Sequence, residues 1–136
     1  MNSSEIRNPK LILIVDDDPN DIEITRRVLL KMGRDIQVLA VASGEHAVRL
    51  LQEGADLPSL VFLDLKMSGM SGIDTVRWIR ADERLKHIPL IIVTNSTLES
   101  DMRKAYDAGA NSFVHKAFDI EQFSKEIKAH LECWLK

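Results

Sequence analysis

Two uninterrupted apolar segments in the first half of the chain each end in acidic residues. Residues 11–15 are all aliphatic and are followed by Asp16, Asp17 and Asp18, and residues 60–63 are apolar and are followed by Asp64. Apolar runs of this length, rich in branched side chains, are typical of strands that are buried on both faces of a parallel sheet. Helices must then cover both faces of that sheet.

Strand-like and helix-like segments alternate five times along the chain. Further strands are predicted at residues 36–41, 90–94 and 112–115, and the fourth helix is predicted over about residues 97–108. Asp18, Ser43 and Asp119 stand where helix N-caps are expected. The pattern predicts an α/β fold, a doubly wound five-stranded parallel sheet in the order 2-1-3-4-5 with five helices.

The length of 136 residues suits one domain with its own core. Residues 1–9 are polar and end in Pro9, which indicates an N-terminal tail. We expect residues 10–136 to form a single domain, with no output domain after the last helix.

Composition and charge exclude several classes of protein. The formal net charge is −3, with 18 Lys and Arg against 21 Asp and Glu, so no basic surface indicates binding to nucleic acid or to an anionic membrane. The apolar runs are far too short to span a bilayer. Cys133 is the only cysteine, which excludes an internal disulfide and fits a reducing compartment. We therefore expect a cytoplasmic protein.

Polar residues end or follow four of the predicted strands at one edge of the sheet. These residues are Asp16 and Asp17, Asp64, Thr94 and Lys116. Close like charges repel by roughly 4 kcal/mol per pair at an effective dielectric constant of about 20, so the carboxylates indicate a cation site, and their hard oxygens suit Mg²⁺. A carboxylate there can act as a nucleophile and form an acyl phosphate. The metal ion, the Lys116 ammonium and the Thr94 hydroxyl would then neutralise the phosphoryl oxygens.

Each residue also has a simpler structural explanation. Asp18 caps a helix, Asp64 alone is compatible with a solvated strand end, Thr94 with a turn, and Lys116 with an ordinary surface lysine. It is the coincidence of these residues at the ends of different strands that favours a site.

Together these residues make the chain resemble the receiver domain of bacterial response regulators, which has a flavodoxin-like fold. The resemblance covers about residues 10–132 and is carried by residues 15–19, 64–72, 92–94, 108–110 and 116–118. It implies that Asp64 accepts a phosphoryl group from a sensor histidine kinase. It also implies that Asp17, Asp64 and the Lys66 carbonyl bind Mg²⁺, with Asp16 assisting through water.

The same resemblance assigns the remaining site residues. Thr94 and Phe113 would be the switch pair, and Lys116 would contact the phosphoryl group. The segments 106–113, 119–123 and 133–135 resemble the stand-alone regulators of phytochrome-type sensor kinases. The implied partners are such a kinase, a phosphotransfer protein or a second copy of the chain, and no enzymatic turnover is expected.

The chain departs from the receiver pattern at two positions where proline is usual, Ala117 and Ser68. Because a non-proline cis bond costs roughly 2.5–4 kcal/mol, we predict a trans Lys116–Ala117 bond with some displacement of that loop. Ser68 adds an N–H and is expected to loosen its turn.

Three other classes of protein remain as alternatives. A flavodoxin-like electron carrier needs a phosphate-binding first loop, which the acidic residues 16–21 would repel. A haloacid-dehalogenase-like phosphatase requires a second aspartate two residues after the nucleophile, where this chain has Lys66. The third alternative is a receiver-like interaction module that works without phosphorylation.

Overall fold

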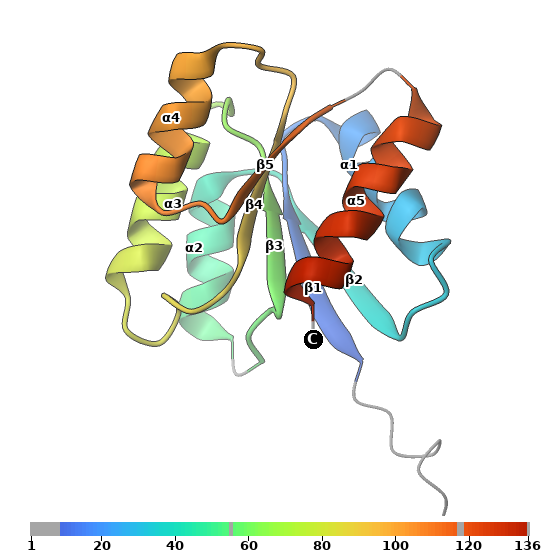
Figure 1. Ribbon diagram of the computed structural model, residues 1–136. Helices are drawn as coiled ribbons and strands as arrows, with labels where there is room; N and C mark the ends of the chain where they lie inside the picture. Colours follow the sequence, from blue (N-terminus) through green and yellow to red (C-terminus); the bar gives the residue numbers. More distant parts are fainter. Residues whose placement is uncertain (1–8, 55, 117–118, 136) are drawn as a thin grey trace, which may run out of the picture.

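The computed structural model describes residues 9–54, 56–116 and 119–135 and contains a five-stranded parallel sheet in the order β2-β1-β3-β4-β5 (Figure 1). The strands are β1 (Lys10–Val15), β2 (Ile36–Val41), β3 (Leu60–Leu63), β4 (Leu90–Thr94) and β5 (Ser112–His115). The helices are α1 (Pro19–Leu30), α2 (Gly44–Glu53), α3 (Gly72–Ala81), α4 (Glu99–Ala108) and α5 (Ile120–Trp134). The predicted fold and strand order are confirmed.

Helices cover both faces of the sheet, as the apolar strands require. Helices α2, α3 and α4 lie on one face and α1 and α5 on the other (Figure 1). Strands β3 and β4 are buried along their whole length, because both of their faces meet helices. Two apolar clusters, one on each face, form the core.

Most of the helices begin where the predicted caps stand. The Asp18 carboxylate accepts hydrogen bonds from the backbone N–H groups of Asn20 and Asp21, and Ser43 and Asp119 cap α2 and α5 in the same way. These caps hold α1 and α5 in place at the carboxyl edge of the sheet.

The predicted start of the fourth helix at residue 97 was two residues too early. Helix α4 begins at Glu99, and its N-cap, Leu98, makes no side-chain capping bond. The hydroxyl of Ser96 accepts a hydrogen bond from the Leu98 N–H and donates one to Asp101. This local bonding favours a turn over residues 96–98 in place of a further half-turn of helix.

Two of the sequence predictions lie outside the described residues. These are the predictions for the tail, apart from Pro9, and for the Lys116–Ala117 peptide bond. In the part of the chain that the structure describes, no helix is long and apolar enough to cross a membrane.

Candidate functional site

The carboxyl edge of the sheet, at the top of Figure 1, brings the predicted site residues together. Asp16 follows β1 directly, Asp64 follows β3, Thr94 ends β4 and Lys116 follows β5. The strand pairing aligns these ends, since Val15 is opposite Leu63 in the parallel register. Strand register therefore sets the separation of the two carboxylates, which lie on neighbouring strands.

Three carboxylates converge at this edge. One oxygen from each of Asp16, Asp17 and Asp64 lies within 4.8 Å of the other two. The Asp16 residue is 5% exposed and Asp64 is 9% exposed, while Asp17 faces solvent. Such an arrangement can hold a divalent cation with two buried oxygen donors and an open outer side.

Glycine at position 72 lets the backbone approach the Asp64 strand end closely. A Cβ atom at Gly72 would lie 2.1 Å from the carbonyl oxygen of Asp64 and 2.6 Å from the Cα atom of Leu65. Only glycine fits there, so the start of α3 packs directly against the backbone that carries the Asp64 carboxylate.

Hydrogen bonds orient two of the three carboxylates. Asp16 accepts from the Asp18 N–H at 2.9 Å through Oδ1, and Asp17 accepts from the Ser68 N–H at 3.1 Å through Oδ2. The N–H that Ser68 adds, where a proline would have none, therefore ties the loop after β3 to the loop after β1. This bond opposes the loosening of the turn that we expected at Ser68.

The Lys116 ammonium connects three carboxylates. It donates to Asp16 and to Asp21, at 2.8 Å in both cases, and to Asp64 at 3.3 Å. The Lys116 side chain is only 11% exposed. An ammonium has three N–H donors, so these three acceptors use its whole donor capacity.

Asp21 is the site residue that sequence reasoning missed. It stands in the first turn of α1, where an acidic residue is explained by the helix dipole alone. A signal was present, because Asp21 shares helical spacing with Thr25 and Val28, which are both buried. That spacing turns its carboxylate toward the sheet and toward Lys116.

Burial and charge act in opposite directions on these groups. Burial alone would lower the pKa of Lys116, but its hydrogen bonds to Asp16 and Asp21 and the charge of Asp64 raise that pKa above its ordinary value. Burial raises the pKa of Asp16 above its ordinary value, and the hydrogen bond from Lys116 offsets only part of the effect. The ammonium therefore does not fully offset the cost of burying the Asp16 carboxylate.

The loop after β4 and the start of α4 form another side of the site, away from Asp21 and α1. Thr94 is 2% exposed, and its hydroxyl accepts a hydrogen bond from the Ser96 N–H at 3.2 Å. The Ser96 hydroxyl donates to Asp101 at 2.5 Å, and the Lys66 ammonium lies 3.5 Å from the same carboxylate. The Lys66 side chain is 68% exposed, so its ion pair with Asp101 is a weak contact at the rim.

Phe113 lies on the sheet face that Thr94 occupies, one strand away. Phe113 pairs with Ile92 in the parallel register, and Ile92 and Thr94 point to the same face because they are two residues apart. The half-buried ring lines a surface hollow of about 300 Å³ together with Leu98 and Met102. Thr94 and Phe113 thus lie on the same face of two neighbouring strands.

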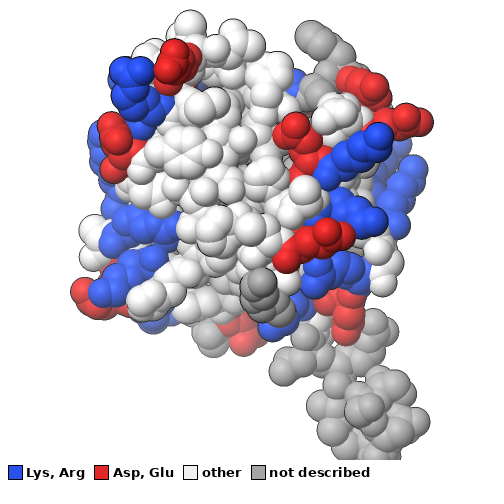
Figure 2. All heavy atoms as spheres, in the orientation of Figure 1, with Lys and Arg blue, Asp and Glu red and all other residues white. Residues whose placement is uncertain are grey.

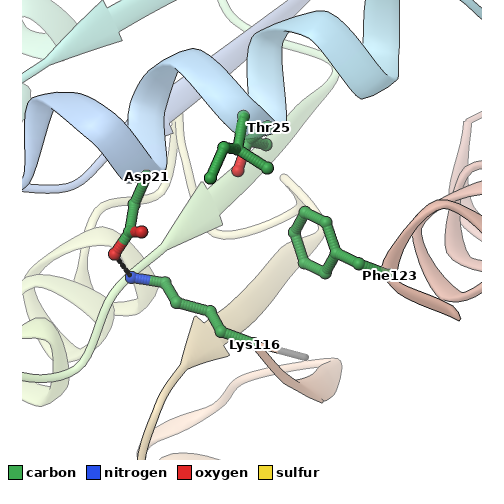
Figure 3. A pocket seen from close by; sticks show the side chains of 5 residues that line it. Asp21, Thr25, Lys116 and Phe123 are labelled. Atoms are coloured by element: carbon green, nitrogen blue, oxygen red, sulfur yellow. Dashed lines mark hydrogen bonds and ion pairs between the residues drawn. The ribbon is translucent and has the colours of Figure 1, made fainter. Parts of the chain in front are cut away.

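A smaller cavity of about 40 Å³ lies beside the Lys116 side chain. Figure 3 shows Asp21 and Thr25 projecting from α1 and Phe123 from α5, with the Lys116 side chain reaching across to Asp21. Ile24 completes the lining. Space therefore remains on the α1 side of the lysine.

Comparison with known proteins identifies relatives over nearly the whole chain. The model of the response regulator receiver domain matches residues 12–128. The probable methanogenesis regulatory protein FilR2 of Methanothrix harundinacea is 29% identical over 96% of this chain and 87% of its own length.

Solved structures of phytochrome response regulators are similar to this chain. The phosphorylated cyanobacterial phytochrome response regulator RcpA is 30% identical, with a TM-score of 0.87 over 95% of this chain and 96% of its own. The Mn²⁺-bound form of response regulator Rcp1 is 26% identical, with a TM-score of 0.84 over 94% and 96% of the two chains. The bacteriophytochrome response regulator AtBRR is 32% identical, with a TM-score of 0.74 over 90% and 92%.

Proposed function

We propose that this chain, which belongs to the response regulator receiver family, accepts a phosphoryl group on Asp64 from the phosphohistidine of a sensor histidine kinase. One observation carries the proposal: the nearly buried Asp64 carboxylate lies in a group of three carboxylates and 3.3 Å from the Lys116 ammonium. Receiver domains are signalling modules, and residues 10–136 would act as one such domain.

Mg²⁺ is the cation that we assign to the three carboxylates. Asp17, Asp64 and the carbonyl of Lys66 would bind it directly, and Asp16 would act through water. The Asp16 assignment is supported by hydrogen bonds, since both of its oxygens already accept one, from the Asp18 N–H and from Lys116. When bound, Mg²⁺ would neutralise negative charge on the transferring phosphoryl group. The similarity to Rcp1, whose structure is of a Mn²⁺-bound form, supports a divalent ion.

The transfer itself requires little more than alignment. An Asp64 carboxylate oxygen would form a bond to phosphorus while the bond from phosphorus to the kinase histidine nitrogen breaks. The electron pair of the broken bond stays on the imidazole nitrogen. Lys116 would donate to one phosphoryl oxygen and the Thr94 hydroxyl to another, which stabilises the charge of the transition state.

Phosphorylation would change association through the surface of α4, β5 and α5. We assign Thr94 and Phe113 as the pair that transmits the change: the Thr94 hydroxyl turns toward the phosphoryl group, and Phe113 turns into the vacated space. Figure 2 shows charged side chains along both margins of this surface and an uncharged middle. Leu98, Met102 and Tyr106 of this surface are 56%, 41% and 45% exposed, which suits a protein partner.

The partners that we assign are the kinase, a phosphotransfer protein or a second copy of the chain. The similarity to RcpA and AtBRR favours a phytochrome-type kinase. Phosphotransfer to this chain from a purified phytochrome-type kinase should be much faster than from an unrelated histidine kinase. Equal rates would contradict the pairing.

The phosphorylation itself is tested with acetyl phosphate and Mg²⁺, followed by intact-mass measurement. The wild-type protein should gain the mass of one phosphoryl group, and the Asp64→Asn variant should gain none. Without Mg²⁺ the wild-type gain should disappear. An unchanged wild-type mass would contradict the proposal and would favour a receiver-like interaction module that works without phosphorylation.

The switch pair has its own test. The Thr94→Ala variant should still take up phosphoryl groups, but its affinity for a partner or for a second copy should no longer respond to them. An unaltered response would show that Thr94 does not transmit the signal.

A further inference from the structure

The Lys116 ammonium has one acceptor outside the group of three carboxylates. Its contact with Asp21 is 2.8 Å long, equal to that with Asp16 and shorter than the 3.3 Å contact with Asp64. Asp16 and Asp64 belong to the group whose oxygens lie within 4.8 Å of one another, and Asp21 does not. Asp21 is therefore a partner of the lysine that takes no direct part in the predicted cation site.

An ammonium and a divalent cation compete for carboxylate oxygens. Lys116 binds Oδ2 of Asp16 and Oδ2 of Asp64, so two of its three bonds use oxygens at the predicted metal site. The third bond leads to Asp21 on α1 (Figure 3). The more strongly the Lys116 ammonium interacts with Asp21, the more weakly it interacts with Asp16 and Asp64.

Packing does not by itself hold the ammonium on the α1 side. The cavity of about 40 Å³ between α1 and α5 lies beside Lys116, which is more than enough volume for a water molecule. Its other walls are the apolar side chains of Ile24 and Phe123 and the side chain of Thr25, and the three hydrogen bonds of the ammonium go to Asp16, Asp21 and Asp64 rather than to the Thr25 hydroxyl. The position of the ammonium on this side therefore depends on the Asp21 carboxylate.

We propose that Asp21 is a positioning residue for cation binding: its carboxylate draws the Lys116 ammonium toward α1 and weakens the pairing of the ammonium with Asp16 and Asp64, which a divalent ion must displace. The inference rests on the proposed function and deepens it. In the absence of the Asp21 charge, the ammonium binds the two remaining carboxylates more strongly. A divalent ion must then displace a stronger ion pair.

The test measures the dissociation constant of Mg²⁺ by isothermal titration calorimetry. Asp21→Asn should weaken Mg²⁺ binding about fivefold, because a neutral amide attracts the ammonium less than a carboxylate does. Asp21→Ser, a second neutral variant suited to a helix first turn, should show the same loss. Thermal unfolding of each variant checks that it is folded.

Glu23→Gln is the matched control. It removes one negative charge from the same helix two residues away, where Glu23 pairs with exposed Arg27. Binding of Mg²⁺ should change by less than about twofold in this variant. If Asp21→Asn also stays within about twofold of the wild type, the inference is wrong.

A double-mutant cycle distinguishes positioning from a direct effect of charge. In a Lys116→Met background, binding of Mg²⁺ should be tighter, and Asp21→Asn should then change it by less than about twofold. A fivefold loss that persists without Lys116 would show that Asp21 acts directly on the cation and would overturn the proposal. Wild-type protein that fails to bind Mg²⁺ would contradict the proposed function itself, which is a different outcome.

Discussion

Two cationic side chains lie at opposite edges of the sheet and have opposite kinds of partner. At the amino edge, Arg80 at the end of α3 donates to the carbonyl oxygens of Gly109, Lys86 and Ile88 and to the side-chain oxygen of Asn111 at 2.7–3.0 Å. All four acceptors are neutral. At the carboxyl edge, Lys116 donates only to carboxylates among the partners described above.

Under the proposed function, the difference separates a structural cation, Arg80, from one that responds to a ligand, Lys116. Burial lowers the pKa of Arg80, and its neutral acceptors lie at the edge of the sheet opposite to the predicted cation site. The acceptors of Lys116 are carboxylates. A divalent ion would bind at two of these carboxylates, and one of the two, Asp64, would be phosphorylated. Neutral partners would therefore only stabilise the fold, whereas charged partners would make the site respond to a ligand.

The largest effect on stability is expected at Arg80. Arg80→Met should lower the free energy of unfolding by about 3 kcal/mol, because several partly buried oxygens lose a charged donor. Urea unfolding measures this loss. The affinity for Mg²⁺ should stay within about twofold of the wild-type value, since the site lies at the other edge of the sheet.

Arg77 provides the control on the same helix. Its ion pair with Asp74 has a 3.7 Å separation and side chains that are 63% and 59% exposed. Arg77→Met should change the free energy of unfolding by less than about 0.5 kcal/mol. Equal losses for the two variants would mean that the Arg80 hydrogen bonds have no special structural role.

The next effect is expected at Lys116 and should depend on Mg²⁺. Without divalent ions, Lys116→Met should lower the free energy of unfolding by about 2 kcal/mol, because Asp16 and Asp64 lose their cationic partner. Saturating Mg²⁺ should shrink this deficit relative to the wild type, since the ion binds the same carboxylates. The deficit of Arg80→Met should stay constant. A Lys116→Met deficit that Mg²⁺ leaves unchanged would remove the contrast between the two edges.

A smaller effect, with a defined pH dependence, is expected at Asp16. Because its pKa in the folded protein is raised above the ordinary value of 3.8, chiefly by burial, the folded state binds its proton more tightly than the unfolded state does. Ionisation of Asp16 therefore costs stability as the pH rises through the interval between those two pKa values. In metal-free buffer, Asp16→Asn should raise the free energy of unfolding by on the order of 1 kcal/mol at pH 7. Below the ordinary pKa of Asp16 the substitution should not change it.

Urea unfolding across pH 3–8 measures the dependence at Asp16. A gain that is constant over this range would show that the ionisation of Asp16 is not its cause. A loss at neutral pH would show that the ion pair with Lys116 outweighs burial.

The smallest effect is expected at an exposed ion pair on α1. Glu23 and Arg27 lie 2.9 Å apart with side chains 53% and 72% exposed. Glu23→Gln should change the free energy of unfolding by less than about 0.5 kcal/mol, and the change should decrease in high salt. A change as large as that of Lys116→Met would mean that exposure does not explain the difference between the pairs.

Local signals in the sequence predicted most of the fold. The bounds of β2 and β4 follow from largely apolar segments, and the caps Asp18, Ser43 and Asp119 follow from hydrogen bonds within three residues. The start of α4 was missed because the Ser96 hydroxyl bonds to both Leu98 and Asp101, and residue type alone does not show which partner a hydroxyl takes.

The contacts that the sequence did not predict join distant segments. Asp21 and Lys116 are 95 positions apart, and Arg80 reaches Asn111 across 31 positions. Neither contact has a local pattern, because each depends on how whole helices pack against the sheet. Asp16, Asp64 and Lys116 were predicted because they follow parallel strands, and the ends of parallel strands meet at one edge of the sheet. That argument does not predict the positions of side chains on helices.

Asp64, among the neighbouring carboxylates, is the group that we propose to accept the phosphoryl group. Treatment with acetyl phosphate and Mg²⁺, reduction with borohydride and peptide mass spectrometry locate an aspartyl phosphate, because reduction converts that aspartate to homoserine. We expect homoserine at position 64 and unmodified Asp16, Asp17 and Asp21. Homoserine at any of those three positions, or none in the protein, would contradict the proposal.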